Sequence, residues 1–270
     1  MKKLCFFIIL STFLSLSCYA QQWLLAGSRS AAMGYTSVAN IDFWSVNNNQ
    51  AGMAFYDKNS AGIYYENRFM LKELSYQAFS TCYTTKLGTL GATINYTGDK
   101  NYNTLKAGLG YALKINRKFS FGVQMDYLRT SLADIYKNSN KVTFEIGLLY
   151  KPSENISFGM HTFNPLPIKL AEYADERIPT IVNMGFSYQI NSDIVVNIEA
   201  YKHSEFPLEV RSGGEYHINK IFAARLGICT KPFRYTFGVG AEIKKLNVDF
   251  SSCMHQTLGY SPQISLYYSF

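Results

Sequence analysis

The chain has few charged residues, and past its first twenty positions it lacks long apolar runs. Charged residues make up 17% of its 270 residues, against about 25% in an ordinary soluble domain. No later stretch approaches the roughly 20 apolar residues of a transmembrane helix, which excludes a helical membrane protein. Blocks of like charge are also missing, so nothing supports binding to nucleic acid.

Cysteine and histidine are scarce, which bears on disulfides, metals and catalysis. Three cysteines lie outside the leader described below, an odd number without close spacing: Cys82, Cys229 and Cys253. Neither a disulfide framework nor a metal site is indicated. The four histidines fall near predicted strand ends or loops, where a place at a membrane rim is the ordinary explanation. His255 beside Ser251 and Ser252 is the best candidate for a base and its nucleophile, and we expect no enzyme and no cofactor.

Aromatic residues are abundant instead, with 21 Tyr, 19 Phe and 2 Trp. This composition excludes intrinsic disorder. The chain is 47% hydrophobic, yet its mean hydropathy is −0.07. Apolar residues must therefore be interleaved with polar ones, which is the pattern of β-strands.

The first twenty residues have the anatomy of a secretory signal peptide. A basic start, Met1–Lys3, precedes the apolar stretch Leu4–Leu16. In Cys18-Tyr19-Ala20, the small residues Cys18 and Ala20 occupy the −3 and −1 positions for cleavage after Ala20. A lipidated Cys18 is the alternative, weakened by Ser15 and by the bulky Tyr19. Loss of Lys2 and Lys3 would lower the formal net charge from +7 to +5.

Strict alternation of apolar and polar residues recurs along the rest of the chain. In Arg234–Ile243, for example, five apolar residues alternate with Arg, Thr, Gly, Gly and Glu. We count fourteen such segments, with twelve possible because the first two are ragged. They are 59–66, 74–85, 88–97, 103–114, 118–130, 141–151, 154–162, 180–190, 193–203, 206–217, 219–229, 233–243, 245–253 and 260–270.

The connections between these segments alternate between short and long. Short ones such as Lys86-Leu87 and Asn191-Ser192 are followed by long ones such as Ser131–Asn140 and Phe163–Pro179. Short turns on one rim and longer loops on the other are typical of a transmembrane barrel. A secreted β-sandwich or soluble barrel is the alternative, but fourteen apolar faces would then need a second layer to bury them. The terminal Phe270, on an alternating segment, resembles the insertion signal of Gram-negative outer-membrane barrels.

If the apolar faces point to lipid, the opposite faces point into a lumen. They carry charges of both signs, namely Lys106, Asp126, Glu145, Glu199, Glu209, Arg211, Glu215, Arg225, Arg234, Glu242 and Asp249. These charges are expected to form a bracing ion-pair lattice, or alternatively a polar pathway. The same faces are rich in glycine, which marks a close approach by another segment. The candidate is the chain before the first strand, so we expect a signal peptide at 1–20, a hatch-like segment at 21–58 and a barrel at 59–270.

This N-terminal segment carries a family resemblance. Ala26–Gly34, Ser37–Ala39, Asp42 and Asn49–Ala54 resemble the entry motif of FadL-type outer-membrane barrels, and more closely that of the PorV/PorQ-like family of Bacteroidota. Gln50 stands where the family pattern has proline. The resemblance implies fourteen strands and a segment folded into the lumen as a hatch. The motif residues are Gly27, Arg29, Met33, Gly34, Asp42, Asn49 and Gly52.

The resemblance implies two functions for a monomeric outer-membrane barrel of a Gram-negative bacterium. The first is a passive channel or transporter for small hydrophobic compounds. A candidate capture loop supports it, with the apolar residues Phe163, Leu166, Ile168, Leu170 and Tyr173; a lid across the barrel mouth is the alternative reading of that loop. The second function is an accessory or attachment subunit of a type IX protein secretion system. The expected partners are accordingly membrane lipid, a hydrophobic ligand or secretion-system proteins.

Overall fold

The alternating segments form fourteen antiparallel strands, as predicted, and the alternative of twelve is wrong. The computed structural model describes residues 25–132, 138–166, 168 and 177–270, so the predicted signal peptide lies outside the described residues. The strands are β1 (Ser60–Asn67), β2 (Ser75–Thr85), β3 (Gly88–Gly98), β4 (Tyr102–Lys114), β5 (Phe119–Leu132), β6 (Ser139–Ser153), β7 (Ile156–Phe163), β8 (Ile181–Gln189), β9 (Ile194–His203), β10 (Glu209–His217), β11 (Phe222–Thr230), β12 (Phe233–Ile243), β13 (Leu246–His255) and β14 (Gly259–Ser269).

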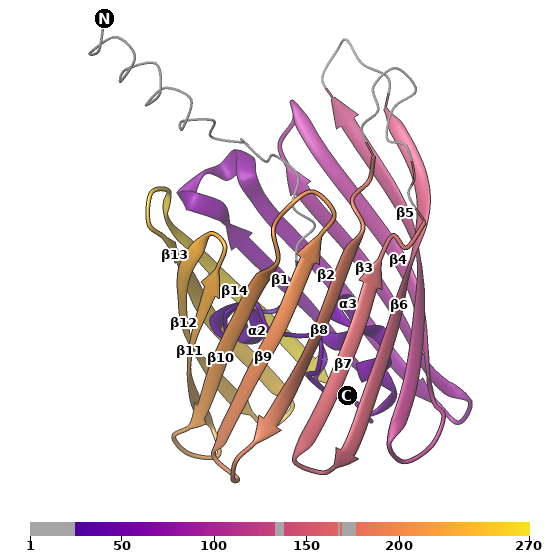
Figure 1. Cartoon of the computed structure of the whole chain (residues 1–270), viewed down its shortest axis with the longest axis vertical. Coiled ribbons are helices and arrows are strands. Elements are labelled where there is room, and N and C mark those ends of the chain that lie inside the picture. Colours follow the sequence, from indigo (N-terminus) through magenta and orange to yellow (C-terminus); the bar gives the residue numbers. More distant parts are fainter. Residues whose placement is uncertain (1–24, 133–137, 167, 169–176) are drawn as a thin grey trace, which may run out of the picture.

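Each strand pairs with the next along the chain, and the last pairs with the first (Figure 1). The closing seam joins β1 to β14 in register from Ser60 opposite Ser269 to Glu66 opposite Gln263. Closure leaves no strand edge with unpaired backbone groups, which is the condition for a sheet to cross a bilayer.

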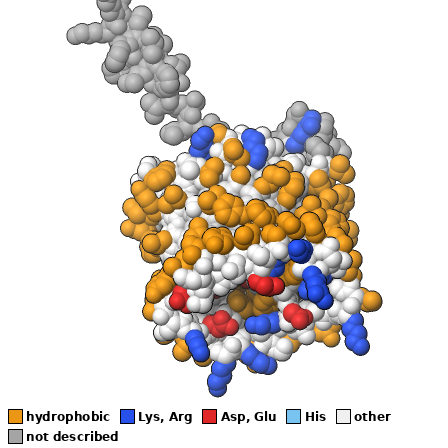
Figure 2. All heavy atoms as spheres, turned by 60° about the horizontal axis from the view of Figure 1, so that its bottom comes forward, with side chains coloured by type: hydrophobic (Ala, Val, Ile, Leu, Met, Phe, Trp, Pro, Cys, Tyr) orange, Lys and Arg blue, Asp and Glu red, His pale blue; other side chains and the backbone are white. Residues whose placement is uncertain are grey.

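The outer face of the barrel is an apolar belt. Side chains such as Leu109 and Leu226 are 68% and 70% exposed, and hydrophobic side chains form a band across the face of the wall seen in Figure 2. Their alternation with buried polar residues is the signature of a transmembrane barrel.

The two rims differ in the length of their connections, as predicted. The short turns, such as that between β2 and β3, lie at the bottom of Figure 1, and β5 and β7, which precede the long connections, end at the top. The connection predicted over 254–259 is shorter than expected, because β13 runs to His255 and β14 begins at Gly259. The segment predicted at 206–217 becomes a strand only at Glu209, after Pro207, since proline cannot donate to the ladder.

The helical elements are short. α2 (Ser28–Ala32), α3 (Ser45–Asn48) and the 3-10 helix η1 (Gln50–Ala54) lie inside the barrel, while η2 (Arg68–Met70) and η3 (Lys72–Leu74) form the β1–β2 connection. Within the described part of the chain, no helix has the length and apolar character to cross a bilayer. The three cysteines are free and buried.

Candidate functional site

The N-terminal segment, residues 25–59, lies in the half of the lumen nearer the short turns (Figure 1). Its path is set by local conformation. Gly34 and Tyr35 take the left-handed backbone region, with φ of 68° and 59°, and turn the chain after α2. The Asn49 side chain accepts from the Ala51 N–H and caps η1, as asparagine does at helix starts.

This segment touches each of the fourteen strands. Direct hydrogen bonds join the Ser28 N–H to Ser265 Oγ on β14 at 3.1 Å, and the Gly34 N–H to Thr236 Oγ1 on β12 at 2.8 Å. On the opposite side, Ser120 of β5 and Ser157 of β7 donate to backbone carbonyls of the segment, each at 2.7 Å. The remaining strands meet it through side chains or glycines. The segment therefore spans the cross-section of the barrel.

Inward-facing glycines make room for the segment. A Cβ atom added at Gly122, Gly159, Gly213 or Gly227 would overlap the backbone of the segment, at Gln50–Ala51, Val38–Ala39 and Met33–Gly34. Glycine in a strand weakens it unless another chain approaches closely. The glycine-rich inner face predicted from the sequence is thus the surface on which the segment packs.

Arg29 ties the segment to the wall on the β10–β13 side. Its guanidinium donates twice to Glu215, from Nε at 2.9 Å and Nη2 at 2.7 Å, and once to Asp42 at 2.8 Å. Arg225 also donates to Glu215 at 2.5 Å and to Asp249 at 2.6 Å. Paired guanidinium–carboxylate hydrogen bonds of this kind are stronger than hydrogen bonds between neutral groups.

A second anchor lies on β9. Glu199 accepts the N–H groups of Ser37 and Val38 at 2.7 and 2.9 Å. Toward the long-loop rim, Glu209 accepts from Arg211 at 2.9 Å and from Arg234 at 2.5 Å. The carboxylates of this side are therefore occupied by the segment and by neighbouring strands.

The third anchor is at η1. Gln50 Nε2 donates to Glu145 Oε2 at 2.6 Å, and Glu145 also accepts from Lys106 at 2.7 Å and contacts His161 at 3.0 Å. Gln50 stands where the family pattern has proline, yet the tight turn forms. Here the amide side chain joins the segment to β6.

The lumen has an apolar side facing this charged side. Phe43, Trp44 and Met53 of the segment pack with Tyr64 and Tyr76 of β1 and β2 in one buried cluster. Phe43 and Trp44 meet edge to face, with ring centroids 4.9 Å apart, a favoured aromatic geometry. We call this group the aromatic cluster.

All seven motif residues come together in the lumen. Arg29, Gly34, Asp42 and Asn49 are described above. Gly27 has a φ of 105°, and its lack of a Cβ makes room for Trp44. Met33 is buried, and Gly52 packs closely on Ser45. Of the eleven predicted lumen charges, nine are buried, Arg234 is partly buried and Glu242 lies exposed at the mouth.

The predicted rim position is wrong for His161, which is buried inside the barrel because it occupies an inward position of β7 and contacts Glu145. His203 is also buried, but it is the last residue of β9, as its predicted place near a strand end requires. His255 Nδ1 accepts from the backbone of Thr257 and Leu258, while Ser251 donates to Gln263. Over the described residues no cluster of ligands suited to a metal occurs.

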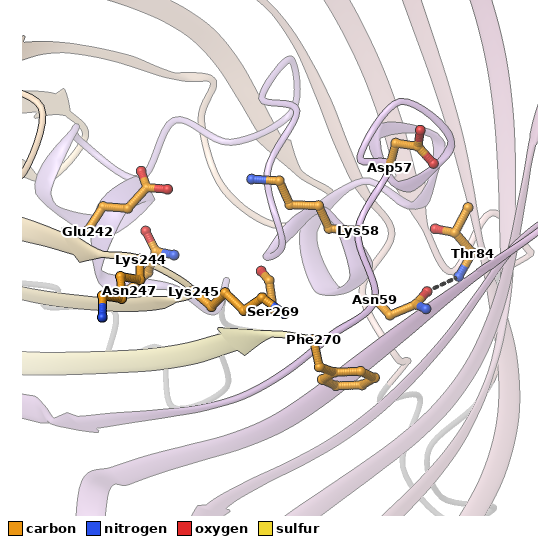
Figure 3. A pocket seen from close by; sticks show the side chains of 10 residues that line it. All are labelled: Asp57, Lys58, Asn59, Thr84, Glu242, Lys244, Lys245, Asn247, Ser269 and Phe270. Atoms are coloured by element: carbon orange, nitrogen blue, oxygen red, sulfur yellow. Dashed lines mark hydrogen bonds between the residues drawn. The ribbon is translucent and has the colours of Figure 1, made fainter.

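The short-turn mouth is polar and hollowed. A cavity of about 180 Å³ lies beneath the segment between Arg29, Asp42 and Glu242, and charged side chains surround the opening in Figure 2. Next to it, a pocket of about 450 Å³ sits at the closing seam, where Lys58 and Glu242 face each other across the opening and the Phe270 ring points away (Figure 3).

The candidate capture loop is divided between two environments. Phe163 is buried and packs with Leu128, Ile178, Ile181 and Tyr201, and Ile168 covers this group, which we call the mouth cluster. Leu166 is 61% exposed at the long-loop rim. Leu170 and Tyr173 lie outside the described residues. Phe163 points inward because it continues the inward row of β7.

No protein-family profile and no curated protein matches the chain. Its fold is similar to that of the Pseudomonas putida toluene transporter TodX, with a TM-score of 0.68, 14% identity, and 90% of this chain and 98% of that chain covered. It is also similar to a Pseudomonas aeruginosa FadL homologue, with a TM-score of 0.67, 13% identity, and coverage of 93% and 99%. These likenesses show a FadL-like barrel fold.

Proposed function

We propose that the chain is an outer-membrane channel of a Gram-negative bacterium for small hydrophobic compounds, with the N-terminal segment as its gate. The observation that carries the proposal is the contact of residues 25–59 with each of the fourteen strands. A barrel closed in this way admits a compound only when the segment shifts, so passage would be gated. The names of the structural neighbours, a toluene transporter and a FadL homologue, support a hydrophobic cargo.

The aromatic cluster offers the path for such a compound. The opposite side of the lumen is lined by paired charges such as Arg29 with Glu215, which an apolar compound cannot satisfy or replace. Phe43, Trp44 and Met53 are apolar and buried in the aromatic cluster, so this contact can open and close without leaving a charge unpaired. We therefore place the route between the segment and β1–β3, entered past the mouth cluster and the exposed Leu166.

A reversible clamp tests the gate. Val46 Cγ2 of the segment lies 2.5 Å from the position of a Cβ at Gly91 of β3, and the other nearest atoms belong to the flexible Met53 side chain. Val46→Cys with Gly91→Cys therefore brings two thiols within disulfide range. The three native cysteines are replaced by alanine in this background. We expect oxidised vesicles to take up a monoaromatic hydrocarbon more slowly than reduced ones, with uptake restored by dithiothreitol.

Each single-cysteine variant is the matched control, since it cannot form the clamp. Equal uptake by oxidised and reduced double variants, with the disulfide shown by mass spectrometry, would overturn the gate. A clamp that slows a hydrophilic solute but not the hydrocarbon would overturn the hydrophobic cargo.

Leu166 tests the capture role of its loop. Leu166→Ser removes exposed apolar surface without touching the core, so hydrocarbon uptake is expected to fall while the free energy of unfolding stays within about 0.5 kcal/mol. Phe163→Ala is the contrasting variant: it empties a buried site and is expected to cost about 3–5 kcal/mol. Unchanged uptake in Leu166→Ser would assign the loop to a structural lid.

A second candidate is an accessory or attachment subunit of a type IX secretion system, with protein partners at the rims. It is favoured by the motif residues of Ala26–Gly34 and Asn49–Ala54, which resemble PorV/PorQ-like proteins. Co-purification from the native membrane with mass spectrometry separates the two. A stoichiometric protein partner would favour this role over a monomeric channel, and bound hydrophobic compound would favour transport.

A further inference from the structure

The lipid-facing side of β10 has a gap in its row of large side chains. Its outward residues are Val210, Ser212, Gly214 and Tyr216, and the two in the middle have little or no side chain. Val210 and Tyr216 at the ends are 42% and 52% exposed. The gap therefore lies within the apolar belt, closed along the strand at both ends.

Large apolar residues on the neighbouring strands form the walls of this gap. In register, Ser212 lies between Ile198 of β9 and Ile228 of β11. Gly214 lies between Val196 and Leu226 in the same way. The result is a shallow trough along β10 that extends to β12, with a volume of about 440 Å³.

Gly214 differs from the other glycines inside strands. A Cβ at the adjacent Gly213 would overlap Met33 of the N-terminal segment, whereas one at Gly214 would meet only Val195 O, at 3.9 Å. Nothing inside the protein requires glycine at position 214. Because glycine weakens a strand, its presence there has its effect on the outside, where it opens the trough.

We propose that the trough binds one acyl chain of a membrane phospholipid. It is continuous with the lipid-facing belt, so its occupant enters from the hydrocarbon of the bilayer. Its walls are apolar, and the Ser212 hydroxyl already donates to Asn197 O at 3.2 Å. A hydrocarbon chain matches a trough that has apolar walls and offers no free polar partner at Ser212.

The floor of the trough is only one backbone thick. On its inner side, Gly213 and Gly227 lie against Met33 and Gly34. The acyl chain and the N-terminal segment thus pack on the two faces of the same pair of strands. This inference stands independently of the proposed transport function, since it concerns the outer surface of the wall.

Photo-crosslinking tests the proposal. The folded protein is reconstituted in phosphatidylcholine vesicles that contain a phospholipid with a diazirine at mid-chain, irradiated, digested and mapped by mass spectrometry. We expect lipid adducts on the peptides of β10 and β11 severalfold above those on β4 and β5, whose belt residues are similarly exposed. Gly214→Leu fills the trough and is expected to reduce the β10–β11 adducts to the level of the rest of the belt.

Ala107→Leu on β4 is the matched control, because it adds a leucine side chain at another outward position of the belt. Heat-modified migration in gels shows that each variant is folded, and Ser212→Leu provides a second filling variant. Equal adduct yields around the wild-type belt, or β10–β11 adducts that survive both filling variants, would overturn the proposal.

Discussion

At the residue scale, Arg29 joins the N-terminal segment to the wall through two carboxylates, Asp42 and Glu215. Arg29→Gln leaves Glu215, which is buried, with fewer donors, and we expect a loss of about 2–3 kcal/mol in the free energy of unfolding. Urea titration in liposomes measures it. Arg29→Lys keeps the charge but not the planar fork, so its loss should be smaller.

Lys220 supplies the control for that experiment, since it lines the same mouth cavity but is exposed. Lys220→Gln should change the stability by no more than about 0.5 kcal/mol. If Arg29→Gln and Lys220→Gln behaved alike, the anchoring role of Arg29 would be wrong.

Gln50 allows a sharper comparison at a single atom. Its amide donates to Glu145 at 2.6 Å. Gln50→Met removes the donor at similar size, and a hydrogen bond to a charged group contributes about 1.5–3 kcal/mol. Gln50→Glu places a second carboxylate there and should release η1 further. Hydrogen exchange over residues 45–54 reports both: protection should fall from wild type to Met to Glu, and equal protection would contradict the anchor.

At the scale of elements, β10 presents opposite environments at consecutive residues. Gly213 faces the segment and Gly214 faces the trough. Gly213→Ala forces Met33 to move, an overpacking that costs about 1–3 kcal/mol. Gly214→Ala meets open space and should be neutral or stabilising by about 0.4–1 kcal/mol. Thermal unfolding of the two variants side by side would reveal a wrong assignment of faces if the order were reversed.

Period-two alternation made the strands predictable. In Arg234–Ile243 the residue type alternates at every position between the outward and the inward face, and β12 covers Phe233–Ile243. The inward glycines also indicated a packed segment, because glycine has few other uses in strand interiors. These features are local, so a short window of sequence contains them.

The contacts of the segment were not predictable in the same way. Nothing near Ser28 or Gln50 in the sequence indicates Ser265 or Glu145 as a partner, because these pairings depend on how the closed barrel places distant strands. The trough at Ser212 and Gly214 was missed for a related reason: it appears only when the register sets them between large residues of β9 and β11.

At the scale of the whole molecule, the apolar belt predicts how charge is tolerated. Leu109 lies within the belt, whereas Leu87 lies in the short β2–β3 turn at the rim, and they are 68% and 80% exposed. Leu109→Arg should cost about 2–4 kcal/mol and Leu87→Arg about 0–1 kcal/mol. Urea unfolding in liposomes measures both, and equal costs would contradict this placement in the bilayer.

The enclosed segment also constrains how the molecule assembles. Ser28 bonds to Ser265, 237 residues later, and the β1–β14 seam shuts around the same segment. The contact between Ser28 and Ser265 can therefore form only after β14, the last strand, has been added to the barrel. Contacts between ends so distant in the chain slow folding. We expect the β1–β14 seam to close and the N-terminal segment to become enclosed in one late kinetic step, with the segment already inside the barrel when the last strands pair.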